Sequence, residues 1–163
     1  MLAAARRFRF FLLACLVLSA VLAPGRPGAG ETDYRTQIHD GVNALRQKQG
    51  LAALRPRADL QRIAQRYAVE LAGRGLLSHY DAQGKALDAR LHDAGCDDWT
   101  QAGENLARST FSRDFQAADI VRGWNLSSGH YRNIITPGFR FTGIGVAFDA
   151  RREQIYFVQI FVE

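Results

Sequence analysis

The sequence predicts an α+β fold in which helices come first along the chain and strands come last. Amphipathic helical stripes occupy most of the chain before residue 127, and two β-rich runs, Phe141–Asp149 and Gln154–Val162, close it. Because strands and helices do not alternate, and only residues 150–153 separate the last two runs, we expect them to form an antiparallel hairpin. The predicted fold is therefore a small antiparallel sheet flanked by helices.

The first thirty residues have the layout of a secretory signal peptide. Three arginines precede an uncharged run at residues 10–23, and turn-forming residues follow it. The run is shorter than the roughly 20 residues that span a bilayer. We predict that residues 1–30 are removed on export, leaving residues 31–163 as one secreted or periplasmic domain without a stable membrane span. An N-terminal anchor that is not cleaved is the alternative.

Charge and cysteine usage fit an exported domain. Signal removal takes away four of the 21 basic residues and none of the 16 acidic ones, so the domain carries a net charge of only +1. This balance argues against a nucleic-acid partner. Cys15 would leave with the signal, and Cys96 is then expected to be a small buried hydrophobe in a monomeric domain.

Two long segments show apolar residues at helical spacings of three and four. The first helix is predicted over residues 34–50, where the final glycine is placed to end it. Pro56 interrupts the chain. Asp59 is the expected N-cap of a second helix, which a glycine at position 73 or 75 ends. We interpret both apolar stripes as faces of the core.

Shorter elements fill the middle of the chain. Residues 76–84 read as a loop and residues 85–94 as one short helix, whereas residues 100–109 are too short to assign by periodicity. Ser112 or Asp114 is expected to cap the helix that follows.

That helix ends near Trp124, which we expect to be mostly buried, and the chain then turns through residues 127–129. The serines of this turn are expected to supply capping oxygens to a second short helix with His130 in its first turn.

Three polar residues stand far apart in sequence but in similar settings. They are His79 in Ser-His-Tyr-Asp, Glu104 in Ala-Gly-Glu-Asn-Leu-Ala, and His130 after the serine turn. We predict that the fold brings them together in one cleft. His39 is expected on the polar side of the first helix, and His92 is expected to be solvated.

The motifs, taken in order, resemble the CAP superfamily of secreted cysteine-rich, antigen-5 and pathogenesis-related-1 proteins, and its bacterial members most of all. The matching stretches are Leu-Gln-Arg-Ile-Ala-Gln-Arg-Tyr-Ala (60–68), Leu-Ser-His-Tyr-Asp (77–81), Gly-Glu-Asn-Leu-Ala (103–107), Gly-Trp-Asn-Leu-Ser-Ser-Gly-His (123–130), Asn-Ile-Ile (133–135) and Gly-Ile-Gly-Val (143–146). The resemblance implies an α-β-α sandwich over the whole domain.

The resemblance also implies a cleft lined by two histidines and two acids that can hold a divalent metal. The histidines carry over to His79 and His130, and one acid carries over to Glu104. The position of the second acid is Ser127 here, so the set is an incomplete tetrad. Two neutral imidazoles and a carboxylate still suit zinc, with water in a fourth position.

Three interpretations of these residues stay open at this point: a hydrogen-bonded polar patch, metal binding without turnover, and hydrolysis. Neither a Gly-x-Ser-x-Gly nor a His-Glu-x-x-His motif is present to favour an enzyme. The function classes are accordingly a module that binds a metal or small polar ligand, an extracytoplasmic lipid or sterol carrier, and a metal-dependent hydrolase. A cell-surface component is a further possible partner.

Overall fold

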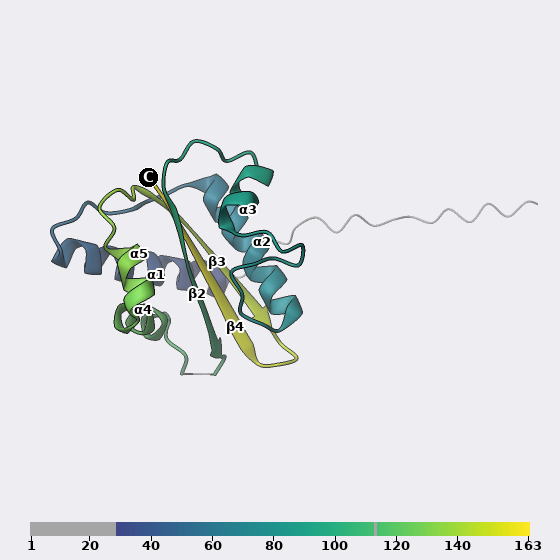
Figure 1. The fold of residues 1–163 in the computed structure, drawn as a ribbon. Helices are drawn as coiled ribbons and strands as arrows, with labels where there is room; N and C mark the ends of the chain where they lie inside the picture. Colours follow the sequence, from purple (N-terminus) through teal and green to yellow (C-terminus); the bar gives the residue numbers. More distant parts are fainter. Residues whose placement is uncertain (1–28, 113) are drawn as a thin grey trace, which may run out of the picture.

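The computed structural model describes residues 29–112 and 114–163, which form three layers with a sheet between two groups of helices (Figure 1). The elements in chain order are α1 (Ala29–Lys48), β1 (Arg55–Pro56), α2 (Ala58–Arg74), α3 (Leu87–Asp93), β2 (Ala102–Thr110), α4 (Ala117–Leu126), α5 (Ser128–Ile134), β3 (Phe141–Asp149) and β4 (Gln154–Val162). The predicted signal peptide falls almost wholly outside the described residues and stays a prediction. Within them, no helix combines the length and apolar character needed to cross a membrane.

The sheet has the strand order β1-β3-β4-β2. β4 pairs antiparallel with β3 on one side and with β2 on the other, as expected for the hairpin. β1 adds a parallel pair, Arg55 with Phe141 and Pro56 with Thr142, so the sheet is mixed rather than purely antiparallel. A two-residue strand has no period that a sequence could reveal. The unassigned segment at residues 100–109 proves to be the edge strand β2.

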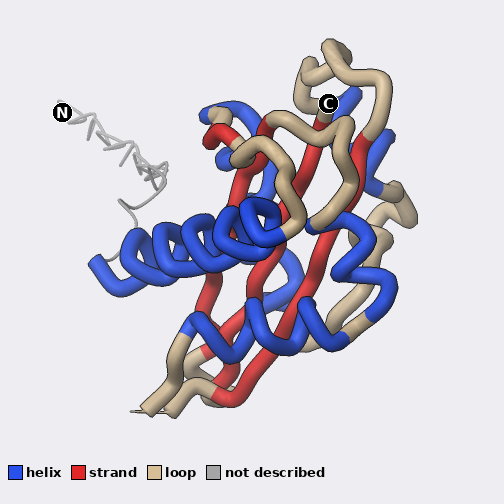
Figure 2. The backbone as a smooth tube through the Cα atoms, turned by 90° about the vertical axis from the view of Figure 1, so that its left-hand side faces the viewer, coloured by secondary structure: helices blue, strands red, loops and turns tan. Residues whose placement is uncertain are grey.

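Each face of the sheet carries its own core, because side chains of β4 alternate between the two faces. α1, α4 and α5 cover one face, and Figure 2 shows α1 crossing the strands. α2 and α3 cover the other face (Figure 1). Ile155 and Phe157 belong to the first core, whereas Tyr156 and Val158 belong to the second. The α-β-α sandwich is therefore confirmed.

α2 packs so closely on β3 that two strand positions must be glycine. A Cβ atom at Gly145 would lie 2.1 Å from the carbonyl oxygen of Ala64, and one at Gly143 would lie 2.2 Å from the carbonyl carbon of Leu60. Both contacts are with helix backbone, which cannot move aside cheaply. The Gly-Ile-Gly-Val motif thus reflects helix–strand contact.

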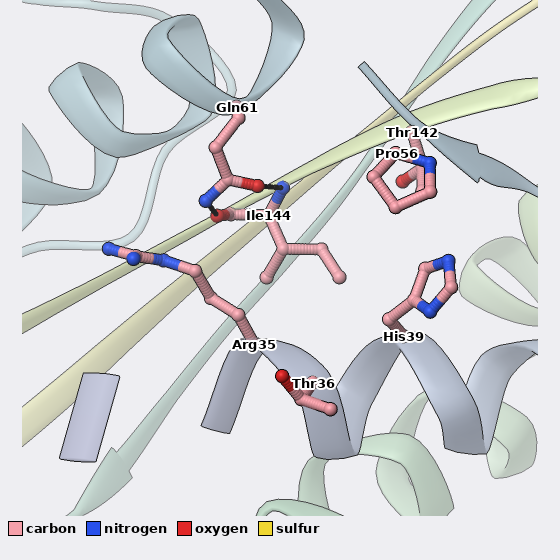
Figure 3. Close-up of a pocket in the computed structure, with 7 residues that line it drawn as sticks. All are labelled: Arg35, Thr36, His39, Pro56, Gln61, Thr142 and Ile144. Atoms are coloured by element: carbon pink, nitrogen blue, oxygen red, sulfur yellow. Dashed lines mark hydrogen bonds between the residues drawn. The ribbon is translucent and has the colours of Figure 1, made fainter. Parts of the chain in front are cut away.

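The exposed edge of β3 is covered by two glutamine side chains of α2. Gln61 Nε2 donates to the backbone carbonyl of Ile144 at 2.5 Å, and Gln61 Oε1 accepts from the N–H of the same residue at 3.2 Å. Gln65 does the same with Val146, at 2.8 Å for the carbonyl and 3.0 Å for the N–H. Figure 3 shows the first of these pairs. The amides replace a neighbouring strand, and this protects an edge that could otherwise pair with another chain.

The N-caps of α2 and α4 differ from the sequence predictions, whereas the short helix with His130 in its first turn is confirmed, as is the glycine stop at Gly75, where φ is 68°. α2 has Arg57 rather than Asp59 as its N-cap, and α4 has Gln116 rather than Ser112 or Asp114. Neither N-cap makes a side-chain capping bond. Both starts lie at the surface, where water can satisfy the first N–H groups.

A fully buried arginine, which the sequence analysis missed, joins α1 to the end of α5. Arg46 is 0% exposed, and burial lowers its pKa. Its guanidinium donates to four backbone carbonyls at 2.8 to 3.0 Å, those of Ala52, Ile134, Thr136 and Phe139. These bonds satisfy carbonyls at the α5 C-terminus and fix the helix that carries His130.

Candidate functional site

The three candidate residues lie on or beside β2, which is an edge strand of the sheet. Glu104 lies on β2, and its side chain points to the face covered by α2 and α3. His79 lies in the loop between those two helices, and His130 lies in the first turn of α5 on the other face. Segments from both outer layers can therefore reach the same edge of the sheet.

His79 and Glu104 are in direct contact. His79 Nδ1 lies 2.9 Å from Glu104 Oε2, where the glutamate side chain is 3% exposed and the histidine side chain 58% exposed. The hydrogen bond to Glu104 raises the pKa of His79, against the opposing effects of burial and of Arg90. The buried carboxylate thus orients an imidazole whose outer edge faces solvent.

Glu104 has a second charged partner that the sequence analysis did not single out. Arg90 Nη2 lies 2.7 Å from Glu104 Oε1, and the arginine side chain is 7% exposed. Its guanidinium lies over the ring of Tyr67, 3.5 Å from the centroid. Both carboxylate oxygens of Glu104 are therefore engaged by protein groups.

His130 is half-buried beside Trp124, with 6.4 Å between the ring centroids. Burial lowers the pKa of His130, and the positive charge of a protonated His79 lowers it further. Trp124 itself is 2% exposed and donates from Nε1 to the carbonyl of Leu106 at 3.1 Å. Its predicted burial is confirmed.

Two asparagines hold the α5 helix against β2. Asn133 Nδ2 donates to the backbone carbonyl of Glu104 at 3.1 Å and to Asn105 Oδ1 at 2.9 Å. Asn105 Nδ2 in turn donates to the backbone carbonyl of His130 at 3.1 Å. Both asparagines stand in motifs that the sequence displays, and their role is to fix the two halves of the site relative to each other.

Ser127 lies between α4 and α5 and is the N-cap of α5. Its side chain makes no capping bond, which corrects the expectation of serine capping oxygens; its backbone carbonyl accepts from the Tyr131 N–H at 2.8 Å instead. Its assignment to the cleft stays a prediction. Ser78 exchanges hydrogen bonds with the backbone of Tyr80 rather than pairing with its neighbour His79.

The other two histidines lie apart from this site. His92 has a side chain 76% exposed, as predicted, and contacts Asp97 at 2.7 Å. His39 is half-buried, and its Nε2 lies 3.0 Å from the carbonyl oxygen of Leu54. With Arg35 and Pro56 it helps to line a cavity of about 340 Å³ between α1, α2 and β3 (Figure 3).

A separate group of polar residues has donor atoms grouped closely enough to hold a metal. Donor atoms of Asp59, Cys96 and Asp98 all lie within 4.8 Å of one another, and among the described residues no other such trio meets that spacing. The Arg57 guanidinium already contacts all three, with Nη2 2.8 Å from Cys96 Sγ. Burial raises the pKa of Cys96 to about 11, so the group presents a thiol rather than a thiolate.

The donor chemistry at β2 fits a divalent metal in type, with two imidazoles and one carboxylate. The three residues do not form a preformed set of metal ligands, because the ligand atoms of His79, Glu104 and His130 do not all lie within 4.8 Å of one another. The direct pair is His79 with Glu104.

Comparison with known proteins identifies the family of this chain. The family model for CAP, described as the cysteine-rich secretory protein family, matches residues 39–161. The chain therefore belongs to the CAP family. It is similar to two Bacillus subtilis proteins, the uncharacterized membrane protein YlbC (30% identical over 82% of this chain) and the uncharacterized protein YkwD (28% over 69%). The matches span only 35% and 42% of those two relatives.

Solved structures show the same fold. An outer surface protein from Borrelia burgdorferi gives a TM-score of 0.70 at 20% identity, covering 80% of this chain and 92% of that one. An extracellular protein containing an SCP domain from Bacillus anthracis gives 0.69 at 23% identity, covering 86% of this chain and 45% of that one.

Proposed function

We propose that this protein is an extracytoplasmic CAP domain that binds a divalent metal such as zinc through His79 and His130. The observation that carries the proposal is the contact between His79 Nδ1 and the buried Glu104 carboxylate at 2.9 Å. Metal-binding histidines commonly donate their second ring N–H to a carboxylate, which fixes the tautomer and the ring orientation.

The contact leaves the right atom free for a metal. When Nδ1 donates its proton to Glu104, the lone pair of a neutral His79 is on Nε2, on a side chain that is 58% exposed. Because both oxygens of Glu104 already have partners, we assign this residue an orienting role rather than direct ligation. This refines the three-ligand set expected from the family resemblance.

His130 contributes a second imidazole with suitable properties. Its lowered pKa favours the neutral form, the only form that can bind a metal. Zinc held by two histidines keeps open positions for water or a small polar ligand and lowers the pKa of a bound water. The chain's own residues orient His79 through Glu104 and favour the neutral form of His130.

Two relatives in fold support a metal role. The structure of NaASP2 with Zn²⁺ gives a TM-score of 0.55 at 14% identity, covering 84% of this chain and 83% of that one. A manganese-bound structure of Ac-ASP-7 gives 0.56 at 16% identity, covering 85% and 75%. The words "extracellular" and "outer surface" in the names of bacterial neighbours support export, although YlbC is named a membrane protein.

Isothermal titration with zinc tests the proposal. The wild type should bind one zinc, and His79→Gln or His130→Gln should weaken binding sharply, since each removes a proposed ligand. His92→Gln, at a solvated histidine, is the matched control and should bind as the wild type does. Zinc binding that survives the double variant His79→Gln, His130→Gln would overturn the proposal. Saturable sterol or fatty-acid binding by that same variant would favour the lipid-carrier alternative.

A further inference from the structure

The buried ion pair of Arg90 with Glu104 is an expensive feature of the core. Both side chains are at least nine-tenths buried, at 7% and 3% exposure. Among the described residues, Arg90 Nε and Nη1 are buried without a hydrogen-bond partner. Buried ion pairs add little to stability compared with apolar residues of similar size, and unsatisfied buried donors add a cost. Stability alone therefore gives no reason for an arginine here.

We infer that Arg90 is a positioning residue for His79, an inference that rests on the proposed metal function. Arg90 acts through Glu104: the guanidinium holds Oε1 at 2.7 Å, which turns Oε2 toward Nδ1 of His79 at 2.9 Å. Without this hold, the Glu104 side chain could turn away from His79 into another rotamer, and Nδ1–H would lose its fixed acceptor. With it, the imidazole has one orientation.

Tyr67 supports both ends of this arrangement. Its ring face lies under the Arg90 guanidinium at 3.5 Å, a cation–π contact that keeps the planar group in place. Its hydroxyl donates to the backbone carbonyl of Ser78 at 2.5 Å, next to His79 in the chain. The contacts thus close a ring that runs from Tyr67 through Arg90, Glu104 and His79 back to Tyr67.

Tyr67 and Arg90 support His79 in two ways, one through its backbone and one through its side chain. Burial raises the pKa of Tyr67 to about 12, so its hydroxyl remains a donor at neutral pH. The hydroxyl fixes where the His79 backbone lies, whereas the ring face and Arg90 fix how the His79 side chain is turned. Removal of the hydroxyl and removal of the guanidinium should therefore have different effects.

The test compares Arg90→Met with the wild type in two measurements. Methionine can fill the space over Tyr67 but cannot hold the carboxylate. In metal-free protein, ¹⁵N NMR of the His79 ring should report one tautomer, with the proton on Nδ1, in the wild type and a mixture of tautomers in Arg90→Met. Zinc affinity should fall about 10- to 100-fold, as for other losses of an orienting partner. Arg122→Met, at an exposed pair with Asp119 on α4, is the control and should change neither readout.

Two further variants keep the test decisive. If Arg90→Met does not fold, Arg90→Lys keeps the positive charge but loses the planar fork, and it should also yield mixed tautomers. Tyr67→Phe keeps the ring face and should retain the single tautomer. A folded Arg90 variant with the wild-type tautomer and affinity would overturn the inference. Failure of the wild type to bind zinc would instead overturn the proposed function, and the metal-free NMR comparison would still decide the role of Arg90.

Discussion

Replacement of Trp124 by alanine should be among the most destabilising single changes in this domain. The side chain is 2% exposed, and its Nε1–H is donated to the carbonyl of Leu106, two residues along β2 from Glu104. Truncation of a buried tryptophan to alanine costs about 3–5 kcal/mol through lost burial and the cavity left behind. The Leu106 carbonyl also loses its partner, which adds about 1–3 kcal/mol unless water enters the cavity.

We expect the total for Trp124→Ala to be about 4–6 kcal/mol, because a water in the cavity offsets part of the lost hydrogen bond. A domain of this size has a total stability of about 5–15 kcal/mol, so this loss is a large fraction of the total. Trp124→Phe keeps most of the volume and should lose only about 1–2 kcal/mol, mainly for the hydrogen bond.

Equilibrium unfolding in urea measures these differences, provided that the dependence of the unfolding free energy on urea concentration is unchanged. Leu126→Ala is the matched control on the same helix, where the side chain is 80% exposed, and should shift stability by less than about 0.5 kcal/mol. A loss below about 1 kcal/mol for Trp124→Ala would refute the burial of this α4 side chain against β2.

Three other predictions follow from particular contacts. Gly145→Ala should expand or unfold the domain, seen as a large loss in thermal stability, because its Cβ would lie 2.1 Å from the Ala64 carbonyl oxygen; a thermal midpoint within about 2 °C of the wild type would contradict the close helix–strand contact. Glu104 raises the pKa of His79, so the contact between protonated His79 and Glu104 stabilises the fold fully below about pH 6.5. This stabilisation is lost as pH rises through the pKa that His79 has in the folded protein. The difference in unfolding free energy between wild type and His79→Gln should therefore shrink between about pH 5.5 and 8.5, and a difference that grows would contradict the contact. Cys96 should react with a thiol reagent only on unfolding, since burial raises its pKa to about 11, and rapid reaction in the native protein would show the burial to be wrong.

The helices and the final hairpin were predictable because their patterns are local. Apolar spacing identified the buried face of α2, and β-rich composition identified β3 and β4. β2 escaped assignment because its burial does not alternate cleanly. Its outer edge is covered by side chains from α4 and α5, and an apolar pattern does not report such contacts. The starts of α2 and α4 were missed because their N-cap residues, Arg57 and Gln116, make no side-chain capping bond.

The candidate site was predictable in its residues but not in its supports. His79, Glu104 and His130 stand in recognisable motifs, whereas Arg46 and Arg90 look like ordinary surface charges in the sequence. Arg46 can be buried because it donates to backbone carbonyls such as that of Ile134, 88 residues away in the chain. Arg90 can be buried because it pairs with the carboxylate of Glu104, 14 residues away. Only the tertiary fold supplies those partners, so no local pattern marks them.

X-ray absorption at the zinc edge, on zinc-loaded protein, tests the central claim most directly, because it identifies the atoms bound to the metal. We expect two imidazole nitrogens at about 2.0–2.1 Å from the zinc in the wild type and the loss of one of them in His79→Gln. A sulfur ligand at about 2.3 Å would place the metal at Cys96 and its carboxylate neighbours instead, and would contradict the account.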